Sequence, residues 1–325
     1  MNVTAKKIIF VTTIQLLLDI WKKYRLKNIP CIILGEGSNV LFLENYEGIV
    51  IINRIKGIKI KEKKNFWSLH ILSGEKWSDL VSYTLRIKIF GLENLALIPG
   101  CIGSAAIQNI GAYGLEFKEI CEYVDVISLK NGKIIRMQNK ECNFSYRNSI
   151  FKNKYNYGYA IIAVGIKVSK TWKPIVSSIF FKKEIFKINP YKIYNIICKL
   201  RKKKIPDPNK LGNAGSFFKN PIIHPKKAKK ILFLYKDMPY FLEKNGFIKI
   251  PAAWLIEHSN FKNIHIGDAA IYQKQKLILI NKKKAKSKDI LKLAIKIQKH
   301  VLKKFYILLK PEVDLISSSG KIKLL

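Results

Sequence analysis

Arginine is scarce in this sequence, although the chain as a whole is strongly basic. Only six of its 60 basic residues are arginine, against 22 acidic residues and a net charge of +38. The lysines are scattered along the chain, and Lys, Ile and Asn are abundant together, as A/T-rich codons would produce. Nucleic-acid-binding proteins instead gather basic residues on one motif or face. No obligatory nucleic acid partner is therefore expected, whereas a polyanionic small substrate agrees with the charge.

Metal-binding and disulfide patterns are also absent from the sequence. The cysteines are odd in number, widely spaced and without a C-x-x-C pair: Cys31, Cys101, Cys121, Cys142 and Cys198. The five histidines form no H-E-x-x-H motif. These absences argue against a zinc cluster and against a disulfide framework. They fit a reducing cytoplasm, and we expect no metal.

No hydrophobic run is typical of a membrane span. Residues 94–115 carry no charge and are long enough, but Pro99, four glycines and three amide side chains interrupt them. The first ten residues show no apolar segment followed by a cleavage site. We therefore expect no membrane insertion and a cytoplasmic location.

The composition and the pattern of apolar residues predict an α+β fold. The chain has 325 residues, 48% hydrophobic and 25% charged, which suits two or three globular domains. Strands over 7–13 and 31–35 enclose a helix over 14–27 as a βαβ unit. Ser78 is expected to cap a helix over 79–90. The Pro and Gly density after a lysine-rich helix indicates two unequal parts that divide near 190–205.

Two glycine-rich stretches follow predicted strands. The first, GEGSN (35–39), contains only G-x-G and lacks the third glycine of a dinucleotide fingerprint, so a tight turn also explains it. The second, IPGCIGSAAIQNIGAYG (98–114), lacks the G-K-[ST] of a P-loop. Its glycines let the backbone approach a ligand, and its neutral donors and amides could bind phosphate. Together the two stretches indicate a cofactor with a pyrophosphate.

A third stretch, GNAGSFFKNP (212–221), holds Ser216 between a flexible run and two phenylalanines. Either a surface turn or a serine presented to a substrate would explain it. The S-x-x-K match at Ser216 recurs at four other serines, and S-D-N and K-T-G are absent, so an acyl-enzyme nucleophile is not indicated.

Two further residues are candidates for carboxylate chemistry. Arg147 lies in FSYRNS, and a surface ion pair would explain it equally. However, arginine is scarce here, and a planar guanidinium binds carboxylates in a bidentate manner that lysine cannot match. Glu312 follows a proline at the start of a predicted strand, where an exposed edge carboxylate is the alternative.

Six stretches together resemble one family closely, the flavoenzyme UDP-N-acetylenolpyruvoylglucosamine reductase (UDP-N-acetylmuramate dehydrogenase, MurB family). They occur in the family's order and cover nearly the whole chain: ILGEGSNVLFLENY, GLENLALIPGCIGSAAIQNIGAYG, ECNFSYRNSIFK, IPDPNKLGNAGSFFKNP, AAWLIEHS and LKPEVDLI. The resemblance implies an FAD-binding region of the vanillyl-alcohol-oxidase type and a separate α+β substrate domain. We expect 1–190 to form the FAD region, with subdomains of about 1–55 and 56–190. Residues 191–325 would form the substrate domain, with the last strand returning to the FAD region.

The resemblance also implies an activity. NADPH would reduce FAD, which would reduce UDP-N-acetylglucosamine enolpyruvate to UDP-N-acetylmuramate for peptidoglycan synthesis, and hence for cell wall, cell shape and division. The protein would be a monomer whose partners are this UDP-sugar and NADPH. Matched motif by motif, the catalytic residues fall on Arg147, Ser216 and Glu312, and substrate contacts fall on Tyr113, Lys204, Asn220 and Gln275. FAD contacts fall on Gly35, Gly37, Ser38, Asn39, Pro99, Gly100, Gly103, Ser104, Asn109 and Gly111.

The chemistry of these residues agrees with that reaction. Hydride addition to the alkene leaves carbanion character beside a carboxylate, which needs positive charge and hydrogen-bond donors. Arg147 can bind the carboxylate, and Glu312 can orient it or share a proton. Ser216 is a weak acid that can protonate the carbanion only when it is pre-positioned.

The sequence departs from the family at three places. The family's Asn-Thr-Phe segment before the first strand is not in this sequence, so we expect the two glycine-rich loops to hold most of the FAD. Ser178 stands where the longer-looped subgroup has a capping tyrosine, and Asp314 stands where the family has an arginine. Two other functions stay open: a flavin oxidase of a small alcohol or sugar, and a basic nucleic-acid-binding protein without catalysis.

Overall fold

The computed structural model describes residues 2–176, 188–259 and 264–322. The chain divides into two compact units. The N-terminal unit comprises Ala5–Ser38 and Glu47–Arg201, and the C-terminal unit comprises Met1–Thr4, Asn39–Tyr46 and Lys202–Leu325. The chain passes from the N-terminal unit to the C-terminal unit after Arg201, inside the 190–205 region where the sequence predicts a division. Which unit binds FAD and which binds the substrate stays a prediction.

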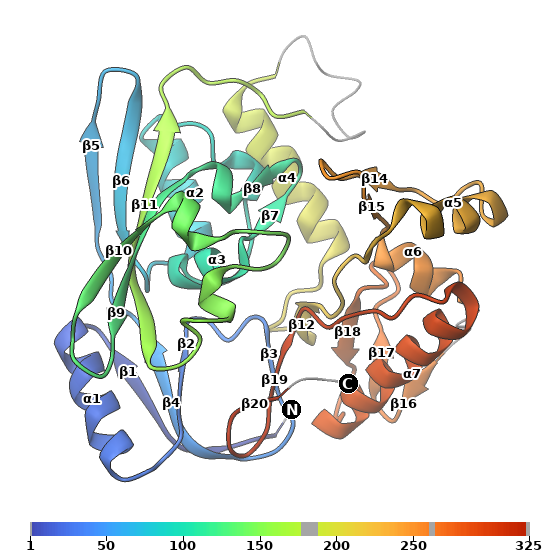
Figure 1. The fold of residues 1–325 in the computed structure, drawn as a ribbon, viewed down its shortest axis with the longest axis horizontal. Coiled ribbons are helices and arrows are strands. Elements are labelled where there is room, and N and C mark those ends of the chain that lie inside the picture. The colour runs from blue at the N-terminus through green and yellow to red at the C-terminus, as the bar shows by residue number, and fades with distance from the viewer. Residues whose placement is uncertain (1, 177–187, 260–263, 323–325) are drawn as a thin grey trace. The chain divides into compact units, whose positions relative to one another are not determined.

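A five-stranded antiparallel sheet organises the N-terminal unit (Figure 1). Its strand order is β10-β9-β11-β6-β5. The central strand is β11, which is 11 residues long and is buried without interruption from Ala160 to Ile166. The strands are β5 (Ile58–Glu62), β6 (Phe66–Leu72), β9 (Cys121–Ser128), β10 (Ile134–Gln138) and β11 (Tyr159–Ser169).

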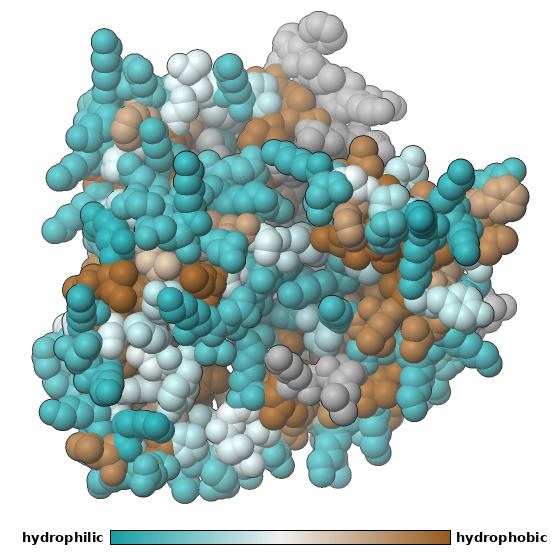
Figure 2. Space-filling model, in the orientation of Figure 1, coloured by the Kyte–Doolittle hydropathy of each residue, from teal (hydrophilic) through white to brown (hydrophobic). Residues whose placement is uncertain are grey.

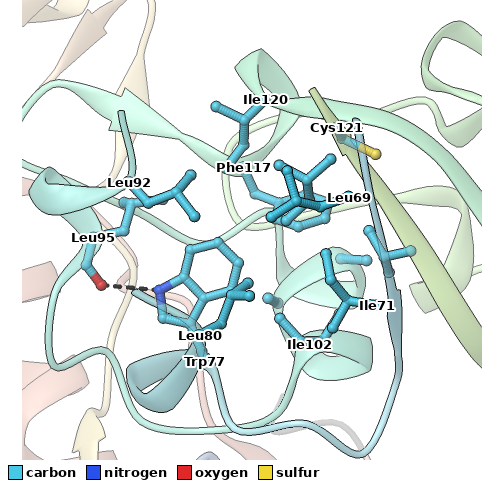
Figure 3. Close-up of a cluster of buried hydrophobic side chains, with 14 of the residues drawn as sticks. Leu69, Ile71, Trp77, Leu80, Leu92, Leu95, Ile102, Phe117, Ile120 and Cys121 are labelled. Atoms are coloured by element: carbon cyan, nitrogen blue, oxygen red, sulfur yellow. Dashed lines mark hydrogen bonds between the residues drawn. The ribbon is translucent and has the colours of Figure 1, made fainter. Parts of the chain in front are cut away.

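Helices α2 (Trp77–Arg86) and α3 (Ile102–Gln108) enclose the core of this unit with the sheet. Trp77 is only 1% exposed, and its indole Nε1 donates to the carbonyl of Leu95 at 2.9 Å. The rings of Phe117 and Trp77 pack against each other in a T-shaped arrangement (Figure 3). Burial of one large apolar side chain contributes about 1.5–3 kcal/mol. This cluster therefore fixes the segment that leads into the second glycine-rich stretch.

A second, three-stranded sheet carries the N-terminal helix α1 (Ile14–Leu26). Thr13 caps α1 by accepting from the amide of Leu16, and Leu17, Ile20 and Trp21 form its buried stripe. The predicted βαβ unit is present, but β4 lies between its two strands, in the order β1-β4-β2. The strands are β1 (Ala5–Val11), β2 (Cys31–Leu34) and β4 (Tyr46–Asn53).

The expected helix cap at Ser78 is wrong. Helix α2 begins at Trp77, and Lys76 takes the cap position without a side-chain hydrogen bond. The Ser78 hydroxyl donates instead to the carboxylate of Asp79 at 3.2 Å. The buried Trp77 starts the helix one residue before the position that the capping preference suggests.

Helix α4 (Pro190–Lys204) packs Ile193 and Ile197 into the same core as Trp77. The two side chains are four residues apart and therefore share one face of the helix. The short strands β7 (Gly111–Ala112) and β8 (Leu115–Glu116) complete the described elements of this unit, together with single 3₁₀ turns.

The C-terminal unit is built on the long helix α7 (Ser287–Phe305). Its apolar stripe is buried: Ile290, Leu293, Ala294, Ile297 and Val301. One sheet has the order β12-β18-β17-β16, and a second has the order β13-β15-β14. The elements are β12 (Gly212–Ser216), β13 (Ile222–Ile223), α5 (Pro225–Leu234), β14 (Phe241–Leu242), β15 (Ile248–Lys249), α6 (Ala252–Glu257), β16 (His265–Ile266), β17 (Ala269–Ile271) and β18 (Ile278–Asn281).

A third sheet of the C-terminal unit joins distant parts of the chain. Strand β3 (Val40–Phe42) pairs in parallel with β19 (Asp314–Ile316), which also pairs with β20 (Lys321–Ile322). Leu41 and Leu315 lie in register and are buried with α7. The segment after the first glycine-rich stretch therefore belongs to the same unit as the end of the chain.

Hydrophilic residues are spread over most of the face shown in Figure 2 and are not gathered in one place. This distribution agrees with the scattered lysines of the sequence. Among the described residues, no helix is both long and apolar enough to cross a membrane, and no group of His, Cys, Asp and Glu could hold a metal ion.

Candidate active site

The two glycine-rich loops of the N-terminal unit lie in direct contact. A Cβ on Gly35 would lie 3.0 Å from the Cys101 sulfur. Gly100 has φ +109°, and a Cβ there would lie 2.8 Å from Ser104 Oγ and 3.3 Å from Ser38 Oγ. Glycine is needed at both positions because only a backbone without a side chain lets the loops approach so closely. The loops predicted to bind one cofactor are therefore adjacent.

Charged side chains fix the first loop. Arg54 Nη1 donates to the carbonyl of Gly35 at 3.0 Å, and its Nη2 pairs with Glu36 at 2.9 Å. Burial, and then the Glu36 carboxylate, raise the pKa of Cys101 to about 11, so this thiol is protonated near neutral pH. The sequence prediction missed Arg54, although the scarcity of arginine was a signal for it.

Several predicted cofactor residues of the second stretch are hydrogen-bonded inside the fold. The Gly103 amide donates to Ser73 O at 3.0 Å. The Ser104 hydroxyl caps α3 through the amide and the carbonyl of Cys101. Helix α3 itself was not predicted, because its small uncharged residues look like a loop. Pro99 is exposed, and cofactor contacts by these residues stay a prediction.

Asn109 ends α3 in the left-handed conformation, with φ +42°, and is fully buried. Its amide nitrogen donates to Glu116 Oε2 at 3.1 Å and to the carbonyl of Ser145 at 3.0 Å. Its amide oxygen accepts from the Lys118 amide at 2.9 Å. Asn109 therefore links the glycine-rich segment by a hydrogen bond to the loop that carries Arg147.

Arg147 lies against this segment and is half-buried. Its backbone has φ +51°, and its Nη2 donates to the carbonyl of Gly111 at 2.9 Å. A Cβ on Gly111 would lie 3.4 Å from Arg147 Nη1 and 3.0 Å from Glu116 Cγ. A side chain at Gly111 would thus crowd Glu116 and the carbonyl of Leu115, and would only touch Arg147. The structure brings together the predicted residues at 109, 111 and 147.

Tyr113, a predicted substrate contact, lies in the same segment with φ +49°. Its carbonyl accepts from Asn94 Nδ2 at 2.8 Å. Burial raises the pKa of its hydroxyl, and the charge of Arg201 opposes that rise. Asn94 and Arg201 were not among the predicted site residues.

The C-terminal unit brings Ser216 and Glu312 close along the backbone. Ser216 ends β12, and the Phe217 and Phe218 that follow are 2% and 1% exposed. The Glu312 amide donates to the carbonyl of Phe217 at 2.8 Å. The stretch at Ser216 is therefore not a surface turn, because the two phenyl rings anchor it in the core, and Glu312 is half-buried.

Asn39, predicted with the FAD loop, also lies in the C-terminal unit. Its Nδ2 donates to the carbonyl of Glu312 at 3.0 Å, and its own carbonyl accepts from the Asp314 amide at 3.0 Å. Asp314, at the family's arginine position, pairs with Lys321 at 2.7 Å. Asn39 therefore positions the candidate catalytic glutamate through its backbone.

The remaining predicted substrate contacts lie in the C-terminal unit. Asn220 Oδ1 accepts from the Ala252 amide at 2.9 Å, at the start of α6. Gln275 occupies the turn between β17 and β18, and Lys204 is the last residue of α4. Ser178 lies outside the described residues. The substrate contacts stay predictions.

The tight packing around Gly100 predicts a cost for any side chain there. Gly100→Ala is expected to lower the free energy of unfolding by about 1–3 kcal/mol, because it adds a strained φ and a clash with Ser104. Gly158→Ala is the matched control, since Gly158 has φ +73° and nothing within 4 Å of its Cβ position. Urea denaturation followed by circular dichroism measures both. An equal loss in the two variants would contradict the tight packing around Gly100.

Comparison with known proteins matches a family to each part of the chain. The profile of the FAD binding domain family matches residues 5–138, and that of the UDP-N-acetylenolpyruvoylglucosamine reductase C-terminal domain matches residues 207–316. A crystal structure of UDP-N-acetylenolpyruvylglucosamine reductase (MurB) from Thermus caldophilus has a TM-score of 0.63 at 23% identity, covering 95% of this chain and 91% of that one. The predicted fold, an FAD-binding domain with a separate α+β domain, is confirmed.

Closely similar sequences extend over the whole chain. The UDP-N-acetylenolpyruvoylglucosamine reductase of Buchnera aphidicola subsp. Schizaphis graminum is 73% identical over 325 residues, covering 100% of this chain and 94% of that protein. The Escherichia coli K12 reductase is 46% identical over 319 residues, covering 98% and 93%. The resemblance drawn from six motifs is confirmed. The chain belongs to the UDP-N-acetylenolpyruvoylglucosamine reductase family.

Proposed function

We propose that this chain is an FAD-dependent oxidoreductase that reduces UDP-N-acetylglucosamine enolpyruvate to UDP-N-acetylmuramate in peptidoglycan precursor synthesis, with NADPH as co-substrate. The observation that carries the proposal is the 46–73% identity, over at least 98% of the chain, to reductases of this name. The N-terminal unit would bind FAD, and the C-terminal unit would supply most contacts to the UDP-sugar.

The described residues fit FAD. Two glycine-rich loops lie in contact at Gly35 and Gly100, so one extended ligand can reach both. The first of them is braced by Arg54 and Glu36. When bound, FAD would supply hydride transfer from NADPH to the enolpyruvyl double bond. The chain's own residues would bind, orient and protonate the substrate.

Arg147 would bind the substrate carboxylate. Its guanidinium is held in one orientation by the carbonyl of Gly111, and Asn109 holds the neighbouring backbone at Ser145. A guanidinium with a fixed plane can make two parallel hydrogen bonds to a carboxylate. It would therefore stabilise negative charge that develops beside the carboxylate during reduction.

Ser216 would protonate the substrate carbon, and Glu312 would assist. The serine is rigidly placed because Phe217 and Phe218 are buried on one side and Phe217 N donates to Leu277 O at 2.7 Å. Glu312 is linked to the same stretch through the carbonyl of Phe217. Rigid placement is what a weak acid such as a hydroxyl requires to act in catalysis.

The direct test follows the colour of the purified protein. We expect a yellow protein with a flavin spectrum that NADPH bleaches without oxygen. UDP-N-acetylglucosamine enolpyruvate should restore the colour much faster than oxygen does. Restoration by oxygen alone would indicate a flavin oxidase. A colourless protein with steeply salt-dependent DNA binding would indicate the nucleic-acid alternative.

Ser216→Ala is expected to bind FAD and to be bleached by NADPH normally. Recovery of the colour with the enolpyruvyl UDP-sugar should slow by roughly 10²–10⁴-fold, since positioned proton transfer contributes about that much. Ser216→Cys should regain part of the rate. Ser319→Ala changes an exposed serine of the same unit and serves as control. Single-turnover reoxidation measures all three, and an unchanged rate in Ser216→Ala removes Ser216 from the mechanism.

Arg147→Lys and Glu312→Gln should each slow substrate reduction at least tenfold, or about 1.4 kcal/mol in the barrier. Lysine keeps the charge but lacks the planar fork. Bleaching by NADPH should stay near normal in both. Arg136→Lys is the control, because Arg136 pairs with Asp125 at 2.7 Å in the same unit and has no proposed role in the reaction. Wild-type turnover in both test variants would refute these assignments.

A further inference from the structure

Tyr113 stands in a turn that its residue type does not favour. Strands β7 and β8 pair with Ala112 opposite Leu115, so Tyr113 and Gly114 form a two-residue hairpin turn. Both have positive φ, +49° at Tyr113 and +89° at Gly114. This is the pattern of a type I′ turn, whose first position is ordinarily Asn, Asp or Gly. A bulky aromatic residue there is an outlier, and such outliers are held by their surroundings and gather at functional sites.

Asn94 holds this turn from outside the hairpin. Its Nδ2 donates one hydrogen bond to the carbonyl of Tyr113 at 2.8 Å and another to the carbonyl of Ile175 at 2.9 Å. These two bonds use both hydrogens of the amide group. Because Asn94 is 3% exposed, the bonds form where water has little access, and solvent would not readily replace them. Asn94 therefore links the turn to a distant segment of the chain.

The backbone that carries Asn94 is itself firmly placed. It forms the single 3₁₀ turn Glu93–Leu95. Both carboxylate oxygens of Glu93 accept from the backbone amide two residues earlier, at 2.8 and 3.0 Å. On the other side, the carbonyl of Leu95 accepts from the indole of Trp77 at 2.9 Å, within the buried cluster (Figure 3). A donor on a turn held at both sides can fix the backbone to which it donates.

We propose that Asn94 is a positioning residue of the active site, which holds the carbonyl of Tyr113 and so fixes the direction of the Tyr113 side chain for contact with the UDP-sugar. This rests on the proposed function, in which Tyr113 contacts the substrate. The direction of a side chain follows from the φ and ψ of its backbone. A turn that relaxed to negative φ would therefore aim the phenol elsewhere. Asn94 acts through Tyr113 and takes no part in the chemical steps.

The first experiment measures substrate binding by the oxidised, FAD-loaded protein, in which no reduction can follow. Asn94→Ala removes both hydrogen bonds, and the Kd for UDP-N-acetylglucosamine enolpyruvate should rise at least tenfold. The flavin spectrum should stay that of the wild type. Reoxidation of the reduced variant at saturating substrate should stay within threefold of the wild-type rate, because Ser216 and Arg147 are unchanged.

Asn139→Ala is the matched control. The Nδ2 of Asn139 also donates to two backbone carbonyls of the same unit, those of Lys118 at 2.7 Å and Cys121 at 2.8 Å. This variant should lose stability in a similar way and keep the wild-type Kd. An equal rise of the Kd in the Asn94 and Asn139 variants would show that a loosened fold is sufficient, and would overturn the proposal.

The second experiment tests whether Asn94 acts through Tyr113. Tyr113→Gly removes the phenol and suits a positive φ, so its turn needs no support from Asn94. The Kd should rise at least tenfold in this variant, and adding Asn94→Ala should raise it no further. Independent effects would multiply instead. A double variant that is weaker than Tyr113→Gly by the full factor of Asn94→Ala would refute the positioning role.

Two further outcomes are distinguished. If Asn94→Ala does not retain FAD, Asn94→Ser, which keeps one donor, supplies the measurement, and its Kd should rise at least threefold. A wild-type Kd in a folded Asn94 variant overturns the positioning role alone. Failure of the proposed function is a different result, because the wild-type protein would then neither bind the enolpyruvyl UDP-sugar nor be reoxidised by it.

Discussion

Much of the N-terminal unit depends on one buried side chain, the amide of Asn109. It satisfies two acceptors and one donor from two separate segments, at 116–118 and at Ser145, while its backbone adopts a left-handed conformation. Asparagine tolerates that conformation better than most residues, and its short amide can bond in both directions. Because Asn109 itself is fully buried, losing the amide would remove three hydrogen bonds at a position closed to water. The position of Arg147 is thus a consequence of how α3 ends.

Arginine and lysine have different tasks in this chain. Lysine supplies 54 of the 60 basic residues, and hydrophilic residues are spread over the face in Figure 2. Several of the arginines instead hold a backbone or a carboxylate in a defined plane. Arg54 binds the carbonyl of Gly35 and the carboxylate of Glu36. Arg136 donates two hydrogen bonds of 2.7 Å to the carboxylate of Asp125. A planar fork with several donors fixes direction, which an ammonium group cannot do. Retention of arginine in so lysine-rich a chain therefore marks positions where geometry matters.

The candidate proton donor depends on a sheet formed by residues far apart in sequence. Strand β3 follows the first glycine-rich loop, and β19 lies near the end of the chain, yet they pair in register. Asn39 then reaches Glu312, and Glu312 reaches the carbonyl beside Ser216. The phenyl rings of Phe217 and Phe218 hold this arrangement against the core that α7 builds. Two predicted catalytic residues are thus neighbours through backbone hydrogen bonds.

The sequence by itself determined the α+β class, the family and the positions of the main helices and strands, because apolar periodicity and six linked motifs are local properties. It also singled out Arg147, Ser216 and Glu312 by residue type and context. Only the tertiary structure decided that Asn109 is a buried link between two segments and that Asn39 joins the C-terminal unit. It also corrected the cap at Ser78 and revealed α3. Hydrogen bonds between distant segments and the burial of a charge depend on packing, which no local pattern encodes.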